Sequence, residues 1–584
     1  MAMAMASATR EDGSALLSDP LLLTVFTYLP LRYRCRCAVA WRQARSLTEK
    51  HPPLVLRLCN ATPALASNVL QCASSSRSSL SALDLHGFCR CDDINPYLSL
   101  HRQLLVLDLS HCRPLPSTVL RHLPSSLKEL SLWDADIVPN RPEPDDEDSE
   151  EEEIFPVRLP RLELEQCFRH CSGLEVLDLR GQGGVDDEIA VEVLGNLQNL
   201  RKVALHGTKV TIQGGASLLQ RRQGTLTRAG FGGLLRSPSD AVPTLCGDVL
   251  RELALPFASS PVNVDLARMP NLDFLYIDGA GTLGGGMHRV LDWNHLATTR
   301  VRQLMLNYAT LPADIFSILL PLAPRLKHLS FVKSQLVGMG NRRQRATPPP
   351  SFLEACLNLV QLGLTSPNIE TTMALASLPS LRILVLDAFS LPSVLDFSTK
   401  AGETSLFQGL EELVLSDTPS VAEFGDTACA LLRTVPLLKS LVWRTQTSVT
   451  SQDVFVMLAG LREPRDLQSL NLEGLSKFSV VEDARTFVAR LVTAVPSLQC
   501  LVVPADLLQV QLFIDSVMSC FPSLQVLGGS QTRSFGGWVE RGGRYVLSYD
   551  VYGYDEAECV KPARSFVNLL SFVDIDQLFG MSAP

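Results

Sequence analysis

The residues best suited to hold a metal ion lie close together near the amino end of the chain. Cys89 and Cys91 carry thiols, and His86, His111 and Cys112 lie near them in the sequence. Thiolates and imidazoles are the ligands that zinc prefers in proteins. The paired C-x-x-C spacing of a structural zinc site is absent, so we interpret these cysteines as structural thiols and predict no metal. Stoichiometric zinc in the purified protein would contradict this interpretation.

A second candidate for chemistry is the glycine-rich stretch "GAGTLGG" (279–285), which has the G-x-G-x-x-G spacing of dinucleotide-binding loops. In such folds an acidic residue at the end of the next strand binds the ribose. The next predicted strand, "VRQLML" (301–306), ends without an acid. The sequence contains no G-x-S-x-G, no phosphate-binding loop and no H-E-x-x-H motif. We therefore predict no cofactor and no catalysis by this chain itself.

Charge and composition exclude further classes of function. The formal net charge is −9, but "DDEDSEEEE" (145–153) holds eight acidic residues, so the remainder is close to neutral. A near-neutral body lacks the basic surface that a nucleic-acid phosphate backbone requires. The apolar stretch "PLLLTVFTYLPL" is too short to cross a bilayer, and no secretory signal precedes it. The 15 cysteines show no paired spacing, so we expect a reducing cytoplasmic or nuclear setting.

One pattern, L-x-x-L-x-L, recurs along most of the chain and must position any functional side chain. It starts at residues 80, 104, 127, 174, 200, 250, 272, 301, 326, 359, 381, 410, 438, 467, 498 and 524, with a weaker unit near Leu226. The usual spacing of about 22–33 residues is the period of leucine-rich repeats. The alternating x-L-x-L part predicts a short strand, and apolar residues between the strands recur at helical spacing.

A single repeat cannot bury both of its leucine rows, so neighbouring repeats must stack. The predicted fold is an α/β leucine-rich-repeat solenoid, with a parallel sheet on the inside of an arc and helices on the outside. Cys112 ends a strand, and Cys171 comes three residues before Leu174. This placement resembles the cysteine-containing class of leucine-rich repeats, in which the thiol packs in the turn. We predict that both thiols are small buried side chains.

The predicted domain boundaries follow from composition. We expect a disordered terminus over 1–14, a helical module over 15–58, the solenoid over 59–530 and a cap over 531–584. The acidic insertion 139–160 is predicted to be a disordered loop, and 338–351 is its basic, proline-rich counterpart. The alternation around "RGGR" in 535–555 predicts a hairpin that covers the last repeat, and "SFVNLLSFVDIDQLF" (565–579) predicts a short terminal helix.

The stretch 17–47 matches none of the repeats. Asp19 followed by Pro20 predicts a helix start, an apolar stripe follows, and Pro30 stops the helix; a second helix is expected over 32–47. The spacing L-x-x-x-L-L-x-x-V-F-x-Y-L-P-L resembles the F-box, which binds a Skp-type adaptor of cullin-RING ubiquitin ligases. The family's usual proline, acid and tryptophan are replaced here by Ser18, Pro20 and Ala44.

The resemblance implies a set of adaptor-contacting residues, and the positions that share the apolar side of the two helices extend it. The set is Leu17, Leu21, Leu22, Val25, Phe26, Leu29, Pro30, Leu31, Cys37 and Val39. A different interpretation also fits these helices, because any solenoid needs its first repeat covered. Under that alternative the stretch is only a cap.

The side chains that flank the strand leucines point into the predicted arc, because side chains alternate across a sheet. Those that we select as candidate partner contacts are Trp133, Arg180, His206, Tyr276, Asn307, His328, Arg444 and Glu473. Aromatic residues and arginine dominate binding energy at interfaces. Val385, Val414 and Val442 form an apolar row, which predicts that a partner or an adjoining loop covers part of this face.

The F-box resemblance implies the substrate-recognition subunit of an SCF-type ubiquitin ligase. The F-box would bind the adaptor and, through it, the cullin scaffold, while the repeats would bind a protein substrate. The alternative is a ligase-independent repeat scaffold for protein–protein interaction. A third class, an activator of a small GTPase, needs a catalytic arginine that the sequence does not single out.

Overall fold

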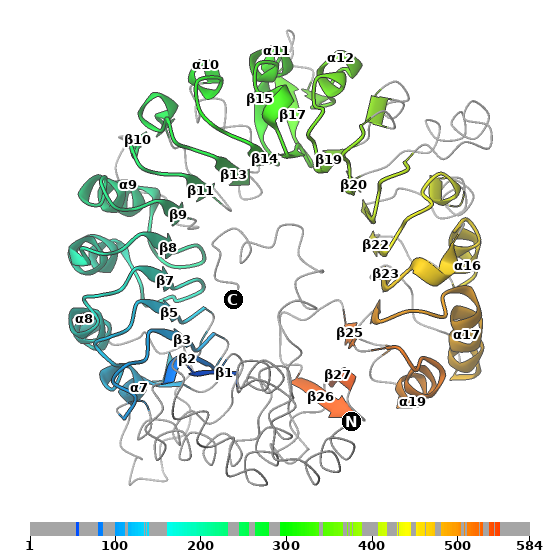
Figure 1. Cartoon of the computed structure of the whole chain (residues 1–584), viewed down its shortest axis with the longest axis horizontal. Helices are drawn as coiled ribbons and strands as arrows, with labels where there is room; N and C mark the ends of the chain where they lie inside the picture. Colours follow the sequence, from blue (N-terminus) through cyan, green and yellow to red (C-terminus); the bar gives the residue numbers. More distant parts are fainter. Residues whose placement is uncertain are drawn as a thin grey trace, which may run out of the picture. The chain divides into compact units, whose positions relative to one another are not determined.

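The computed structural model in Figure 1 describes the repeats more fully than the two ends of the chain. The described residues are 54–57, 80–85, most of 98–138, 161–231, 244–255, 263–278, 293–337, 343–365, most of 371–387, 407–416, most of 429–444, most of 451–472, 481–503, most of 507–529, 537–541 and 544–548. Within these ranges, no helix combines the length and apolar character needed to cross a bilayer. The predicted F-box-like helices over 17–47 lie outside these ranges, as do the acidic insertion 139–160 and the predicted terminal helix 565–579.

The chain divides into two compact units. The first, unit 1, contains Met1–Val157 and Leu162–Leu174; the second, unit 2, contains Arg158–Arg161 and Glu175–Pro584. In unit 1 the strands β1 (Leu54–Arg57), β2 (Leu80–Asp84), β3 (Val106–Asp108) and β5 (Glu129–Ser131) pair in parallel, one after the other. A small parallel pair, β4 (Leu115–Pro116) and β6 (Ile137–Val138), and the helices α7 (Ser117–Arg121) and α8 (Arg161–His170) complete what is described of it.

Unit 2 is a long ladder of parallel strands that pair in chain order. The first half is β7 (Val176–Asp178), β8 (Lys202–Ala204), β9 (Arg228–Gly230), β11 (Glu252–Leu255), β13 (Phe274–Asp278), β14 (Gln303–Asn307) and β16 (His328–Ser330). The second half is β19 (Gln361–Thr365), β20 (Ile383–Asp387), β21 (Glu412–Ser416), β22 (Ser440–Arg444), β23 (Ser469–Leu472), β24 (Cys500–Val503) and β25 (Val526–Gly529). The weak unit near Leu226 forms β9, so it is a true repeat.

The leucines of the repeat pattern hold the ladder together. Leu253, Leu275, Leu304 and Leu329 lie opposite one another on successive strands, and the row continues through Leu362, Leu384, Leu413, Leu441, Leu470, Leu501 and Leu527. Each of these side chains is fully buried. Because burying a leucine contributes about 1.5–3 kcal/mol, a shift of one residue in the register would expose the whole row. The L-x-x-L-x-L pattern therefore determines both the pairing and the register.

The helical segments of unit 2 lie on one side of the ladder, as Figure 1 shows for α9, α11, α16, α17 and α19. They are η2 (Ile189–Val193), η3 (Leu194–Asn196), α9 (Ile212–Arg221), η4 (Leu266–Arg268), α10 (Trp293–Leu296), α11 (Ile315–Leu319), η6 (Ala323–Arg325), α12 (Pro350–Glu354), α16 (Ser451–Leu458), η7 (Pro464–Asp466), α17 (Val481–Ala494) and α19 (Gln511–Cys520). Short strands β10 (Thr244–Leu245) and β12 (Asn263–Val264) form a separate parallel pair.

Two stretches outside the regular repeats adopt structure of their own. The second half of the basic insertion 338–351 is not an unstructured loop, because Arg343–Arg345 (β18) pairs antiparallel with β17 (Gln335–Val337), which also pairs with β15 (Thr310–Pro312). The backbone N–H of Ala346 donates to Ser334, and Ala346 is buried. At the far end, β26 (Gly537–Arg541) and β27 (Arg544–Ser548) form an antiparallel hairpin around "RGGR", and β27 pairs with β25.

Candidate partner-binding face

The side of the unit 2 ladder that faces away from the leucine core is the candidate binding surface, and we call it the strand face. Because side chains alternate along a strand, the residues between the core leucines project to this side. Ala204, Ala254, Phe274, Tyr276 and Met305 form an apolar cluster there. Ala254, Tyr276 and Met305 lie directly opposite one another on β11, β13 and β14. The middle of the strand face is therefore apolar over several repeats.

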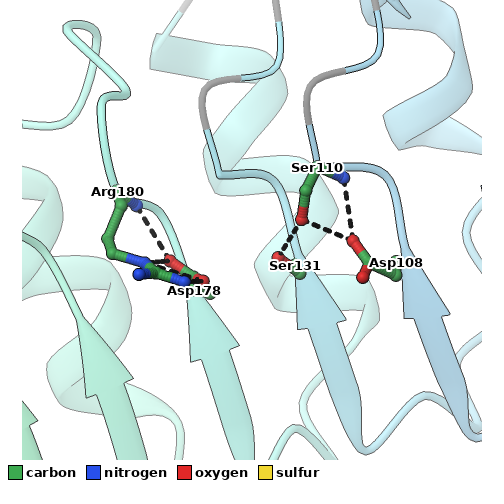
Figure 2. Close-up of polar contacts among 5 residues, drawn as sticks. All are labelled: Asp108, Ser110, Ser131, Asp178 and Arg180. Carbon is green, nitrogen blue, oxygen red and sulfur yellow. Dashed lines mark hydrogen bonds and ion pairs between the residues drawn. The ribbon is translucent and has the colours of Figure 1, made fainter. Parts of the chain in front are cut away.

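A buried ion pair lies at the carboxyl end of β7 (Figure 2). The Arg180 guanidinium donates from Nε to both oxygens of Asp178, at 2.9 and 3.0 Å, and from Nη2 to Oδ2 at 2.6 Å. The Arg180 backbone N–H also donates to Asp178 Oδ1, at 3.1 Å. The two side chains are 3% and 0% exposed. Such bidentate geometry compensates the cost of removing two charges from water.

His206 follows β8 at the equivalent point of the next repeat. Burial, together with the nearby Arg180 charge, lowers the pKa of its imidazole to about 3, although the Asp178 charge acts in the opposite direction. The imidazole is therefore neutral at physiological pH. It contributes hydrogen-bonding atoms to this surface rather than a charge or a pH switch.

Unit 1 has a polar group at the ends of its own strands, also drawn in Figure 2. The Ser110 backbone N–H donates to Asp108 Oδ1 at 2.9 Å, and the Ser110 hydroxyl lies 2.6 Å from the hydroxyl of Ser131. Ser110 and Ser131 are fully buried. Trp133, a predicted partner contact, follows β5 and is half-buried.

Further along unit 2, the strand ends carry a second polar group. Thr365 Oγ1 donates to Asp387 at 3.0 Å and accepts from the Lys333 backbone N–H at 2.5 Å. The Lys333 ammonium lies 3.8 Å from Asp387 and 5.4 Å from the centre of the Tyr308 ring. Lys333 and Tyr308 both adopt positive φ, at 56° and 51°. That backbone conformation is costly for residues other than glycine. The contacts of Lys333 with Asp387 and with the Tyr308 ring hold the two residues in it.

A charged pair lies at the amino-terminal end of neighbouring strands. Arg228 Nη2 is 2.9 Å from Glu252 Oε1, and the side chains are 27% and 18% exposed. Burial raises the pKa of Glu252 to about 7, against the opposing charges of Arg228 and Lys202. Glu252 Oε2 is buried and accepts no hydrogen bond. This carboxyl group is therefore poised to change charge near neutral pH.

The predicted contact residues lie at strands or strand ends, but several are closed off from solvent. Arg180 is 2% exposed, Tyr276 6% and Asn307 6%. The expectation that these three project freely towards a partner is therefore corrected: Arg180 is committed to Asp178, Tyr276 packs in the apolar cluster, and Asn307 accepts a hydrogen bond from Ser330 Oγ at 2.8 Å.

Two of the other predicted contacts, His206 and His328, are half-buried. Burial, and then the charge of Lys327, lowers the pKa of His328. Arg444 is the last residue of β22, and Glu473 lies outside the described residues.

The sequence analysis missed Lys333, Tyr308 and Asp387. Asp387 was detectable, because it directly follows the last leucine of "LRILVL", as Arg180 and Asn307 do in their repeats. Lys333 and Tyr308 gave no such signal, because positive φ at a non-glycine residue is not visible in a repeat pattern.

The apolar row predicted from Val385, Val414 and Val442 is present on the strand face. These residues lie opposite one another on β20, β21 and β22, and Val332 joins them. All four are buried, with exposed fractions between 3% and 7%. The four side chains therefore pack against one another with little exposure to solvent.

Two of the cysteines considered above have structural roles. The Cys112 thiol donates to the Leu85 carbonyl at 3.2 Å, and the Cys171 thiol donates to the Pro124 carbonyl at 3.6 Å; both residues are fully buried, which confirms the prediction. The described part of the chain contains no group of three potential metal ligands. Cys89, Cys91, His86, His111 and the stretch 279–285 lie outside it.

Comparisons with known proteins add little to this description. No protein-family model matches the chain, and no curated protein matches it. Among solved structures, a leucine-rich-repeat protein of Leptospira interrogans is similar over 78% of this chain and 98% of its own length, at 15% sequence identity and a TM-score of 0.30. A TM-score of 0.30 is too low to carry an argument about this chain. Its leucine-rich-repeat character rests on its own strand ladder and leucine register.

Proposed function

We propose that this chain is the substrate-recognition subunit of an SCF-type cullin-RING ubiquitin ligase. The strand face would bind a protein substrate, and the F-box-like segment 17–47 would bind a Skp-type adaptor. The observation that carries the substrate role is the row of polar and charged groups at the carboxyl ends of the unit 2 strands, where Tyr308 and Lys333 reach solvent. The sequence resemblance of 17–47 supports the link to the ligase.

A protein is the partner that best fits this face. Neighbouring strands are about 4.8 Å apart, so the path from β13 to β24 crosses about 38 Å. Stable protein interfaces cover about 800 Å² on each partner, which a surface of this length accommodates. Mixed apolar and charged groups are also typical of such interfaces. The mechanism we propose is tethering, which raises the effective concentration of the substrate near the conjugating enzyme.

The adaptor half of the proposal is tested by a pull-down with a Skp-type adaptor. Wild-type chain should retain the adaptor, and Leu29→Asp and Pro30→Ala should lose it. Arg221→Ala is the matched control, because Arg221 forms an exposed ion pair with Glu192 between helical segments. Absence of the adaptor from the wild-type eluate would refute the ligase assignment and leave the ligase-independent scaffold.

The substrate half is tested separately by the proteins that co-purify with the full chain. Tyr308 is 41% exposed and contacts Lys333, so Tyr308→Ala combined with Lys333→Glu should release proteins held at the carboxyl ends of the strands. The same variant should retain the adaptor. Unchanged co-purification would exclude this region of the strand face as the substrate site.

A further inference from the structure

The turn after the strand has the same backbone conformation in four repeats of unit 2. After β7 and β8 the residue in this turn is a glycine: Gly181 has a φ of 75° and Gly207 a φ of 74°. Tyr308 and Lys333 occupy the same place after β14 and β16, with φ of 51° and 56°. Each of the four residues comes two positions after the last core side chain of its repeat unit. The turn therefore requires positive φ whichever residue occupies it.

Backbone hydrogen bonds show that these turn positions are equivalent. The Gly181 N–H donates to the carbonyl of His206 in the next repeat at 3.1 Å, and the Tyr308 N–H donates to the carbonyl of Val332 in the next repeat at 2.8 Å. Glycine adopts positive φ at no steric cost, whereas a residue with a bulky side chain is strained there. Strain of this kind clusters at ligand-binding sites. Tyr308 and Lys333 are therefore poor choices for the turn itself, and their side chains need a role of their own.

The two side chains reach solvent together at neighbouring strand ends. Tyr308 is 41% exposed, and the Lys333 side chain is 32% exposed. The Lys333 ammonium lies 5.4 Å from the centre of the Tyr308 ring and 3.8 Å from Asp387. The Asp387 side chain is only 2% exposed and also accepts a hydrogen bond from Thr365. A molecule that approaches from solvent therefore meets the lysine and the tyrosine rather than the carboxylate of Asp387.

Strand β18 adds positive charge beside this turn. It pairs antiparallel with β17 in a register that sets Arg345 opposite Gln335, two residues after Lys333. Arg345 is exposed, and β18 begins with a second arginine, Arg343. The three strands of this small sheet, β15, β17 and β18, contain no acidic residue. The surface next to Tyr308 and Lys333 is therefore positively charged.

We propose that Tyr308, Lys333 and Arg345 form a binding site for an acidic, carboxylate-rich segment of a protein partner. This inference rests on the proposed function and names the chemistry of the substrate bound at these strand ends. Lys333 and Arg345 form ion pairs with aspartate and glutamate side chains of the segment, and an arginine can bind one carboxylate through two hydrogen bonds. The Tyr308 ring packs against apolar atoms of the segment, a role in which tyrosine is common at interfaces. Opposite charges at the two surfaces select against basic segments.

The first test is fluorescence anisotropy of the full chain with a short labelled peptide of aspartate, glutamate and leucine, at low salt. The neutral control peptide has asparagine and glutamine in place of the acids. The acidic peptide should bind at least tenfold more tightly than the neutral one, and high salt should remove the difference because it screens exposed charges. Lys333→Gln and Arg345→Gln should each weaken binding of the acidic peptide at least threefold.

The matched control variant is Lys327→Gln. Lys327 is also exposed, but it lies directly before β16, at the opposite end of the strand from Lys333. This variant should bind the acidic peptide as the wild type does. Equal binding of the two peptides, an equal loss in the Lys327 variant, or tighter binding of an oligothymidylate of the same length would overturn the proposal.

The second test separates the Tyr308 side chain from its backbone conformation. Tyr308→Gly removes both the ring and the strain, whereas Tyr308→Ala removes the ring and keeps the strain. Both variants should bind the acidic peptide at least threefold more weakly than the wild type. The glycine variant should nevertheless melt at a higher temperature than the alanine variant. Equal melting temperatures, or undiminished binding of the peptide by both variants, would contradict the assignment.

Failure of the proposed function gives a different result from failure of this inference. If the strand ends bind acidic segments but not the substrate, the wild-type chain still binds the acidic peptide, while Tyr308→Ala combined with Lys333→Glu leaves the co-purifying proteins unchanged. If the substrate binds here through other chemistry, that variant releases the co-purifying proteins, while the acidic and neutral peptides bind the wild type equally.

Discussion

The buried pair Asp178–Arg180 allows a quantitative test of how the strand face is stabilised. Arg180→Met removes the cation but leaves the Asp178 carboxylate, which is 0% exposed, without its partner. Removing one member of a buried ion pair costs about 3–5 kcal/mol, whereas replacing both members by apolar residues is often neutral. We therefore expect the single variant to be strongly destabilised. The double variant Asp178→Leu/Arg180→Met should recover most of that loss.

The assay is equilibrium urea unfolding followed by circular dichroism, together with amide hydrogen exchange in β7 and β8. Local exchange matters because a repeat array responds mainly in the mutated repeat and its neighbours. The matched control is Arg302→Met. Arg302 and Asp273 also form a two-bond ion pair, at 2.5 and 2.8 Å, but their side chains are 51% and 24% exposed.

An exposed pair of this kind contributes about 0.2–1 kcal/mol. The expected order of stability is therefore wild type, Arg302→Met and the double variant close together, with Arg180→Met well below them. If Arg180→Met is as stable as the double variant, the carboxylate of Asp178 does not depend on Arg180, and our account of this site is wrong.

Three further predictions follow from other sites. Because burial raises the folded-state pKa of Glu252 to about 7, the folded state binds its proton more tightly than the unfolded state, so stability at this site falls as pH rises from about 4.5 to 7. Glu252→Gln should remove that fall and stabilise the chain at pH 8 but not at pH 4. If the variant and the wild type differ in free energy of unfolding by the same amount at both pH values, the prediction is wrong. Gly215→Ala in α9 should destabilise the fold by about 1–3 kcal/mol in a thermal melt, because the added Cβ would lie 2.9 Å from the buried ring of Phe231. This loss is expected although alanine normally favours a helix. The control Gly224→Ala has open space around the added Cβ and should cost little. Maleimide should label Cys520 in the native chain before Cys356 and Cys500, because burial raises the pKa of these two thiols to about 12 and about 11, and equal labelling in a peptide map would show that they are accessible.

The amino-acid sequence by itself determined the repeat architecture. Each L-x-x-L-x-L unit specifies which side chains enter the core, so the pattern predicts a strand at each unit and the pairing of neighbouring units, including the weak unit that forms β9. It also predicted the apolar row of Val385, Val414 and Val442, because the strand positions between the leucines must project to the other face. These properties depend on the alternation of side chains along each strand, which can be read directly from the sequence.

Only the tertiary structure decided what each strand-face residue does. Arg180 was expected to meet a partner, but its neighbour Asp178 satisfies it internally. Lys333 and Asp387 come from different repeats, and their contact depends on the stacking of three strands and on a positive φ at Lys333. The sequence gives the order of side chains along one strand. The packing between repeats depends on several repeats at once, and it decides whether a polar side chain faces a partner or forms its hydrogen bonds within the fold.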